Sequence, residues 1–224
     1  MKESRLSFRS IRILSIVRRA SITVKSDTNG KQDIVITGAS AGIGAGIAAR
    51  LAADGHSLVL AARRRRELEN VALYGMQVAV GHFIERGHGH VINISSFLGR
   101  VPLAPHRSAY NAAKAALAAL TTNLRMDLRT TYPDIHMSLV MPGMVATEFG
   151  RNAIGSPPDT PIYSGPQVQS VETVADIDAR TIEHPVAEVY TNPASVEMVR
   201  RYFTDVDAFE TQGDNPWRPR AVGT

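Results

Sequence analysis

No cysteine occurs in the chain, and no apolar run is long enough to span a membrane. The lack of cysteine excludes disulfide bonds, thiolate nucleophiles and cysteine-based zinc sites. A membrane-spanning helix needs about 20 mostly apolar residues, so we expect a soluble protein with no membrane partner. What is present is ordinary for a globular protein, because 44% of the 224 residues are hydrophobic and 21% are charged. This length suits one α/β domain with a sizeable core.

The positive charge of the chain is concentrated at its N-terminus. Residues 1–31 hold eight basic and two acidic side chains, a net charge of +6, whereas the whole chain carries +4. The remaining residues are therefore slightly acidic, which is no footprint for nucleic-acid binding. The Arg- and Ser-rich N-terminal segment has the composition of an organelle transit peptide, but a disordered extension is the favoured interpretation. We accordingly expect a cytoplasmic protein, or an organelle-targeted one if the segment is a transit peptide.

From Asp33 onward, apolar runs alternate with helical patterns, which is typical of βαβ units and a parallel sheet. Strands are predicted at 33–37, 57–62, 90–95, 135–141 and 187–190. Helices are predicted at about 45–54, 65–86, 109–130, 171–183 and 195–203. The pattern divides the chain into a basic extension (1–32), a single Rossmann-like domain (33–203) and an irregular tail (204–224).

A glycine-rich turn follows the first predicted strand and opens a helix. It reads Thr37-Gly-Ala-Ser-Ala-Gly-Ile-Gly44. Glycines at these positions allow a tight turn and let a pyrophosphate approach the backbone N–H groups of a helix N-terminus. The alternative is a strand-to-helix turn whose small residues only serve packing.

Further along, a serine pair, a tyrosine and a lysine suggest acid/base chemistry. Ser95 and Ser96 end a predicted strand, and Tyr110 and Lys114 follow on a predicted helix. The i, i+4 spacing places the phenol and the ammonium on one helix face. A nearby ammonium favours phenolate, so we expect a lowered pKa for Tyr110. Taken singly, each residue has an ordinary structural explanation.

Four motifs occur together in the order of the short-chain dehydrogenase/reductase family. They are the strand–TGxxxGIG–helix start, Ile94-Ser-Ser96, Tyr110-Asn-Ala-Ala-Lys114, and Met141-Pro-Gly143 followed by Thr147. Over roughly residues 33–191, the chain therefore resembles that family. The resemblance implies a doubly wound Rossmann-like α/β fold. It also implies hydride transfer between a nicotinamide cofactor and a small-molecule alcohol or carbonyl.

The resemblance assigns roles to individual residues. Tyr110 becomes the acid/base, Lys114 tunes it and binds the nicotinamide ribose, and Ser96 orients the carbonyl, with Ser95 as the fallback. The implied cofactor-binding residues are Thr37, Gly38, Ser40, Ala41, Gly42, Ile43, Gly44, Tyr110, Lys114, Pro142, Gly143, Val145 and Thr147.

The end of the second predicted strand bears on cofactor choice. An acid there suits the ribose 2′-hydroxyl of NAD, whereas an arginine suits the 2′-phosphate of NADP. This chain has Arg63 and Arg64 and no acid until Glu67. NADP is therefore favoured over NAD, with a solvated basic helix face as the alternative.

After Arg63 the chain departs from the family, because it runs almost directly into Asn70 and lacks about 60 residues, or two βα units. Asn70 is the implied proton-relay asparagine, although the join falls beside it. In family terms about five strands remain, in the order 2-1-5-6-7. Closing the gap gives a stable five-stranded arrangement, but it moves the tyrosine side about 4.8 Å toward the phosphate turn. Leaving the gap open creates two unpaired sheet edges.

Two functional interpretations therefore stay open. The first is an NAD(P)-dependent oxidoreductase that interconverts an alcohol and a carbonyl. The second is a catalytically impaired or inactive truncated family member that keeps at most cofactor binding or helix-mediated association. The resemblance also implies a homo-oligomer through helices 65–86 and 109–130. No metal is expected, because His88 and His90 lack a third ligand.

Overall fold

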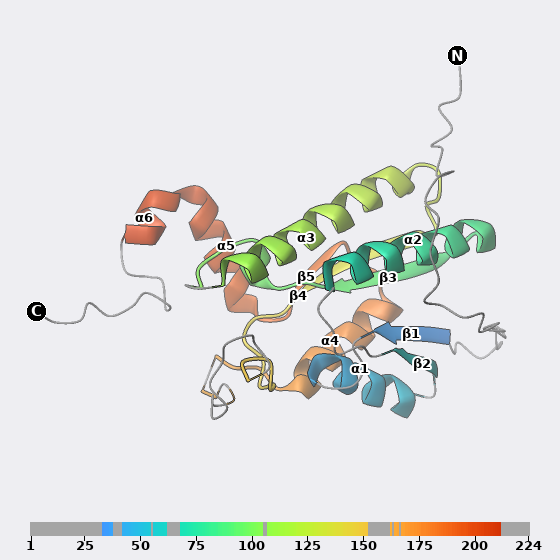
Figure 1. The fold of residues 1–224 in the computed structure, drawn as a ribbon, viewed down its shortest axis with the longest axis horizontal. Coiled ribbons are helices and arrows are strands. Elements are labelled where there is room, and N and C mark those ends of the chain that lie inside the picture. The colour runs from blue at the N-terminus through green and yellow to red at the C-terminus, as the bar shows by residue number, and fades with distance from the viewer. Residues whose placement is uncertain are drawn as a thin grey trace, which may run out of the picture.

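The computed structural model describes residues 33–37, 42–54, 56–61, 68–104, 107–151, 162, 164–165 and 167–211. The predicted alternation of strands and helices is confirmed (Figure 1). In chain order the elements are β1 (Asp33–Thr37), α1 (Gly42–Ala53), β2 (Ser57–Ala61), α2 (Leu68–Arg86), β3 (Gly89–Ile94), the short 3-10 helix η1 (Phe97–Gly99), α3 (Ser108–Arg129), β4 (Ile135–Met141), α4 (Val171–Glu183), β5 (Glu188–Tyr190), α5 (Pro193–Thr204) and α6 (Val206–Thr211).

The five strands form two parallel sheets. β1 pairs with β2, and β3, β4 and β5 pair in that order. Within the described residues, no ladder joins β1 to β3, so the two sheets do not close into one continuous sheet. The α/β class with parallel strands is thus confirmed, whereas a continuous 2-1-5-6-7 order is not. Apolar side chains join the halves instead, because Ile94 of β3 packs against the cluster that contains Ile36 of β1.

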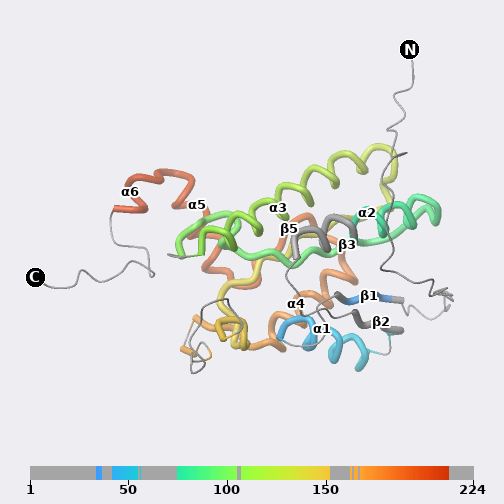
Figure 2. Tube along the Cα trace, viewed as in Figure 1, coloured from blue at the N-terminus to red at the C-terminus, as the bar shows by residue number. Residues whose placement is uncertain are grey.

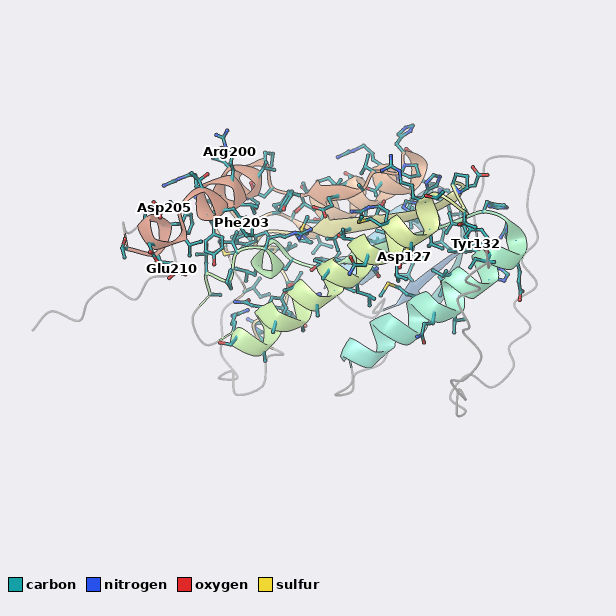
Figure 3. All side chains as sticks on the ribbon, turned by 90° about the horizontal axis from the view of Figure 1, so that it is seen from above. Asp127, Tyr132, Arg200, Phe203, Asp205 and Glu210 are labelled. Atoms are coloured by element: carbon teal, nitrogen blue, oxygen red, sulfur yellow. The ribbon has the colours of Figure 1, made fainter. Side chains whose placement is uncertain are left out.

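Helices α2 and α3 cover one side of the three-stranded sheet and lie next to each other, as Figure 3 shows from above. Met76 of α2 and Leu128 of α3 are buried there with Ile135 and Met137 of β4. Further along β4, Leu139 is buried against Ala118 of α3. These apolar contacts follow the helical period of each helix and the two-residue period of the strand.

Helices α1 and α4 pack together on the opposite side of the molecule (Figure 1). The contact is close because Gly46 has no side chain: a Cβ there would come within 2.2 Å of Val171 Cγ1. Ala175 and Ala179 of α4 meet Ile47 of α1 in the same cluster. Helix α4 therefore contacts the cluster to which both β1 and β3 contribute.

The C-terminal helices lie at one end of the sheet. Figure 2 shows α5 and α6 beside the start of α3, at the end where β4 finishes. Phe209 of α6 is buried with Phe97 and Leu98 of η1. The tail predicted to be irregular over 204–224 therefore contains a packed helix, and the division into 1–32, 33–203 and 204–224 stays a prediction. Residues 1–32 lie outside the described part of the chain.

Candidate active site

The side chains of the candidate site come from the segment after β3 and from the first turns of α3. Ser96 caps η1 in an extended conformation, and its hydroxyl accepts a hydrogen bond from the Leu98 N–H at 3.2 Å. Helix α3 runs back alongside, which brings Tyr110 and Lys114 to the same place. Gly99 permits this approach, since a Cβ there would lie 2.8 Å from the Lys114 carbonyl oxygen. The 3-10 turn and the helix thus meet backbone to backbone.

Ser96 and Tyr110 form the centre of the site. The Ser96 hydroxyl lies within hydrogen-bonding reach of the Tyr110 phenol and lowers its pKa, as does the nearby charge of Arg107. Burial has the larger effect and raises that pKa above its usual value. The expected lowering is therefore reversed in this structure, because removing the phenolate from water costs more than these two contacts return. Tyr110 carries its proton at neutral pH.

Lys114 lies beside Tyr110, with its Nζ 5.8 Å from the centre of the phenol ring. Its ammonium donates a hydrogen bond to the Ile94 carbonyl at 3.0 Å, and burial lowers its pKa. Its charge is not among the groups that shift the pKa of Tyr110. An ammonium has three donors. One of them is therefore engaged at the end of β3 rather than at the phenol.

The two serines differ in what they contact. Ser95 is buried, and its hydroxyl donates a hydrogen bond to the Lys114 carbonyl at 2.8 Å, which fixes β3 to α3. Ser96 contacts Tyr110 instead. The geometry therefore brings Ser96, and not Ser95, to the phenol.

Phe149 is a member of the site that sequence reasoning missed. Its ring lies 5.2 Å from the Tyr110 ring, and the Arg107 guanidinium stacks on it at 5.6 Å. It is 45% exposed. The signal was weak, because a single aromatic residue in a Gly- and Pro-rich segment has no periodicity to mark it.

Of the glycine-rich turn that is predicted to bind the pyrophosphate, the structure describes the residues from Gly42 onward. Gly42 opens α1 with φ +56°, a conformation that favours glycine, and a Cβ there would lie 3.4 Å from Thr147 Cγ2. The start of α1 and the segment after β4 therefore meet at this point. Ile43 and Gly44 continue the first turn of α1.

The turn after β4 is held in place by its neighbours. The Pro142 carbonyl accepts a hydrogen bond from the Phe97 N–H at 3.1 Å. Val145 forms a parallel bridge with Gln169, whose side chain exchanges two hydrogen bonds with Thr191. Pro142, Gly143, Val145 and Thr147 thus lie at the carboxyl end of β4, which is where ligands bind in open α/β sheets.

Several predicted positions lie outside the described part. These are Gly38, Ser40, Ala41, Arg63 and Arg64, together with the side chains of Thr37 and Asn70. Among the described residues no group of three His, Asp or Glu side chains could hold a metal ion. Nor does any helix in the described ranges have the length and apolar character needed to cross a membrane.

A parallel α/β fold with a serine, a tyrosine and a lysine grouped beside a strand end defines a dehydrogenase-like protein. The profile of the short chain dehydrogenase family matches residues 32–74 and 70–155, which together make up more than half of the chain. The chain belongs to this family. The two matches overlap at residues 70–74.

Individual relatives match shorter regions. The chain is 44% identical over 62 residues to dehydrogenase/reductase SDR family member 11 of Bos taurus, a match that covers 27% of this chain and 24% of the relative. It is 29% identical over 154 residues to ketoacyl reductase HetN of Nostoc sp., covering 59% and 50%. The chain thus spans half or less of the length of the curated relatives that it matches.

Solved structures share the fold over more of the chain. A short chain dehydrogenase/reductase from Burkholderia phymatum in complex with NAD aligns with a TM-score of 0.61 at 18% identity, covering 86% of this chain and 98% of that one. A short-chain dehydrogenase from Sphingobium yanoikuyae in complex with NADPH gives 0.58 at 20% identity, covering 87% and 98%. At these identities the likeness concerns the fold.

Proposed function

We propose that the chain is an NADP-preferring oxidoreductase that interconverts an alcohol and a carbonyl of a small molecule. The observation that carries this proposal is the proximity of the Ser96 hydroxyl to the Tyr110 phenol at the carboxyl end of β3. A serine hydroxyl and a protonated phenol that converge on one point can both donate to a single carbonyl oxygen.

In the reductive direction, the phenol of Tyr110 donates its proton to the carbonyl oxygen as a hydride reaches the carbonyl carbon. Ser96 donates a hydrogen bond to the same oxygen. The raised pKa of Tyr110 keeps the phenol protonated at neutral pH, as a proton donor must be. We assign Lys114, whose Nζ lies 5.8 Å from the centre of the Tyr110 ring, to the nicotinamide ribose.

The residues present suit a dinucleotide. The start of α1 offers helix N–H groups and a glycine cradle at Gly42 that a side chain would fill, with Thr147 beside it. We assign the pyrophosphate to residues 37–44 and the nicotinamide to the Pro142–Thr147 segment. Arg63 and Arg64 are the candidates for the 2′-phosphate of NADP. When bound, the nicotinamide supplies or accepts the hydride. The solved relatives in complex with NAD and NADPH support this choice of cofactor class.

A second candidate function rests on the division of the sheet. Within the described ranges β1 and β3 share no ladder, and the Lys114 ammonium is engaged with the Ile94 carbonyl. Both features favour a truncated family member that binds the cofactor but turns over slowly, because a misplacement of about 1 Å can cost about 100-fold in rate.

The two candidates separate in one experiment. The full chain is given NADPH and a panel of ketones, and the loss of NADPH is followed by absorbance. Tyr110→Phe should lower kcat/KM by about 10²–10⁴-fold, because the phenol is the proton donor. Tyr132→Phe is the matched control, since Tyr132 packs among α2 and α3 side chains at the far end of α3 (Figure 3).

Equal turnover by the wild type and Tyr110→Phe would contradict the assignment of the tyrosine. NADPH binding without turnover would favour the second candidate. If neither NADPH nor NADH binds, the enzyme candidate fails, and only helix-mediated association is left for a truncated family member.

We also propose a cytoplasmic protein that forms a homo-oligomer through the predicted helices 65–86 and 109–130. The outer surfaces of the corresponding α2 and α3 carry exposed apolar side chains, among them Val78, Ile84 and Met126. Such side chains are suited to helix packing between subunits.

A further inference from the structure

One peptide unit of helix α3 is held against the end of β3 by a hydrogen bond and by a close backbone contact. The buried Ser95 hydroxyl donates the hydrogen bond to the Lys114 carbonyl at 2.8 Å. Gly99 of η1 makes the contact, since a Cβ there would lie 2.8 Å from both Lys114 C and Lys114 O and 3.0 Å from Ala115 N. Both contacts thus act on the same peptide, between Lys114 and Ala115.

The helix itself does not need the hydrogen bond from Ser95. Lys114 lies well inside α3, which continues to Arg129. The helix ladder therefore supplies its carbonyl with the N–H group four residues further on. A carbonyl oxygen has two lone pairs, and the Ser95 hydroxyl uses the second one. This bond consequently determines where α3 lies relative to β3, rather than whether the helix forms.

The side chain of Lys114 is tied to the neighbouring residue of the same strand. Its ammonium donates a hydrogen bond to the Ile94 carbonyl at 3.0 Å. The N–H groups of Gly89 and Ser95 both donate toward β4, so the residues at the alternate positions direct their backbone groups away from β4. The Ile94 carbonyl therefore lies on the edge of β3 that no described strand pairs with. Lys114 is thus held at its carbonyl and at its ammonium by two consecutive residues.

The next residue along the chain is Ser96, whose hydroxyl lies within reach of the Tyr110 phenol. Tyr110 and Lys114 are about one turn apart and lie on the same face of α3. The hydrogen bonds at Lys114 and the meeting of Ser96 with Tyr110 therefore involve one short stretch of each element. Any displacement of α3 from the end of β3 would change the separation between the serine hydroxyl and the phenol.

We propose that Ser95 is a positioning residue of the active site, which sets the approach of the Tyr110 phenol to the Ser96 hydroxyl by holding the Lys114 carbonyl at the end of β3. Ser95 acts through Lys114 and takes no part in proton transfer. A misplacement of about 1 Å between reacting groups can cost about 100-fold in rate, so one buried hydroxyl is enough to affect turnover. This inference rests on the proposed function, because it takes Ser96 and Tyr110 as the reacting groups.

The kinetic test compares two buried serines. Ser95→Ala should lower kcat for ketone reduction with NADPH about tenfold or more, because the reacting groups lose their alignment. KM should change little, since the substrate-binding contacts stay. Ser138→Ala is the matched control, because the buried Ser138 hydroxyl donates to the Val186 carbonyl from β4. Both variants lose one buried hydrogen bond and should lose similar stability, but Ser138→Ala should leave kcat unchanged.

A titration of the phenol tests the same point without turnover. The six tyrosines of the full chain are replaced by 3-fluorotyrosine, whose phenol is more acidic, and fluorine NMR follows each signal with pH. The signal that disappears in Tyr110→Phe belongs to Tyr110. The charged groups beside this phenol are Arg107, at the N-terminus of α3, and Lys114, within α3. Both move with the helix, so a displacement changes mainly the distance to Ser96.

Contact with Ser96 lowers the pKa of Tyr110. Ser95→Ala should weaken this contact and raise the Tyr110 pKa relative to the wild type, whereas Ser138→Ala should not. A second variant acts on the same peptide from η1. Gly99→Ala places a Cβ within 2.8 Å of backbone atoms of α3, so the helix must shift, and the Tyr110 pKa should rise there too.

A raised Tyr110 pKa in Ser95→Ala, together with the loss of kcat, supports the proposal. It is overturned if Ser95→Ala titrates like Ser138→Ala, or if the two variants turn over equally in a chain whose wild type is active. A wild type that reduces no ketone counts against the proposed function instead. The fluorine titration then decides the role of Ser95 by itself, so the two failures are distinguishable.

Discussion

The two sheets of the molecule differ in how completely their strands are covered. In the three-stranded sheet, β4 is buried on both faces, with Leu139 on one side and Val140 on the other, both fully inaccessible. In the two-stranded sheet, Ile36 of β1 is buried beneath α1 while its neighbour Val35 is 59% exposed. Parallel strands are normally covered on both faces. Strand β4 is therefore covered by side chains on both faces, whereas β1 is covered on one face only.

Helix α4 is the element that connects the two halves. Ala175 and Ala179 contact side chains of both β1 and β3 through a single cluster. The same helix buries Asp178, which is 2% exposed and whose two carboxylate oxygens have no partner among the described residues. Because α4 buries this unpaired carboxyl group, the stability of its packing should depend on pH.

The largest predicted effect concerns Asp178 and, with opposite sign, His90. Burial raises the pKa of Asp178 to about 7, so its contribution to stability is present below pH 4 and is lost as the pH rises through 7. Burial lowers the pKa of His90 to about 4, so its contribution is present above pH 6.5 and is lost as the pH falls through 4. The shifts correspond to roughly 4 and roughly 3 kcal/mol, so they nearly cancel in the wild type.

Single variants should reveal the pH dependence of stability that each of the two residues causes. In Asp178→Asn, stability measured by urea unfolding should fall with acid between pH 6.5 and 4, as only His90 then titrates abnormally. In His90→Gln, which keeps a donor for Ser138, stability should fall as the pH rises from 4 to 7. Parallel pH profiles for the wild type and both variants would refute the cancellation.

Core substitutions should show directly whether the two sheets unfold separately. Leu51 of α1 and Leu139 of β4 are both buried, so either change to alanine costs about 2–5 kcal/mol locally. Because the sheets share no ladder in the described ranges, we expect Leu51→Ala to weaken hydrogen-exchange protection of β1, β2, α1 and α4 but not of the three-stranded sheet. Leu139→Ala should lower protection throughout the three-stranded sheet. Uniform loss in both variants would show that the halves unfold as one unit.

The smallest effect is expected at the uncovered face of β1. Val35→Thr keeps the branched shape suited to a strand and replaces an exposed methyl with a hydroxyl. Its stability should therefore change by less than about 0.5 kcal/mol. A loss of 1 kcal/mol or more on thermal unfolding would mean that Val35 is covered in solution, which would remove the contrast between the halves.

The sequence predicts the elements well because their patterns are local. The alternation of strands and helices follows from periodicity, and Pro142-Gly143 follows β4 as expected. Whether β1 pairs with β3 depends on residues that are distant in the chain, so the pattern within either strand could not predict it. The pKa of Tyr110 was predicted in the wrong direction because the spacing to Lys114 was visible in sequence, whereas the burial of the phenol was not. Phe149 was missed because its contacts with Tyr110 and Arg107 join residues that are distant in the chain.

The junction between the two sheets has a further consequence. Backbone ladders fix register, since each bond joins a particular pair of atoms, but apolar contacts such as that between Ile94 and the Ile36 cluster are non-directional. These apolar contacts set no backbone register between β1 and β3, and the directional contact from Arg50 of α1 to Asp176 of α4 joins helices rather than strands. The separation between the helix start at Gly42 and the phenol of Tyr110 is thus set by side-chain packing and not by backbone pairing. A dinucleotide bound across the two halves would contact both ends of this separation and so help to fix it.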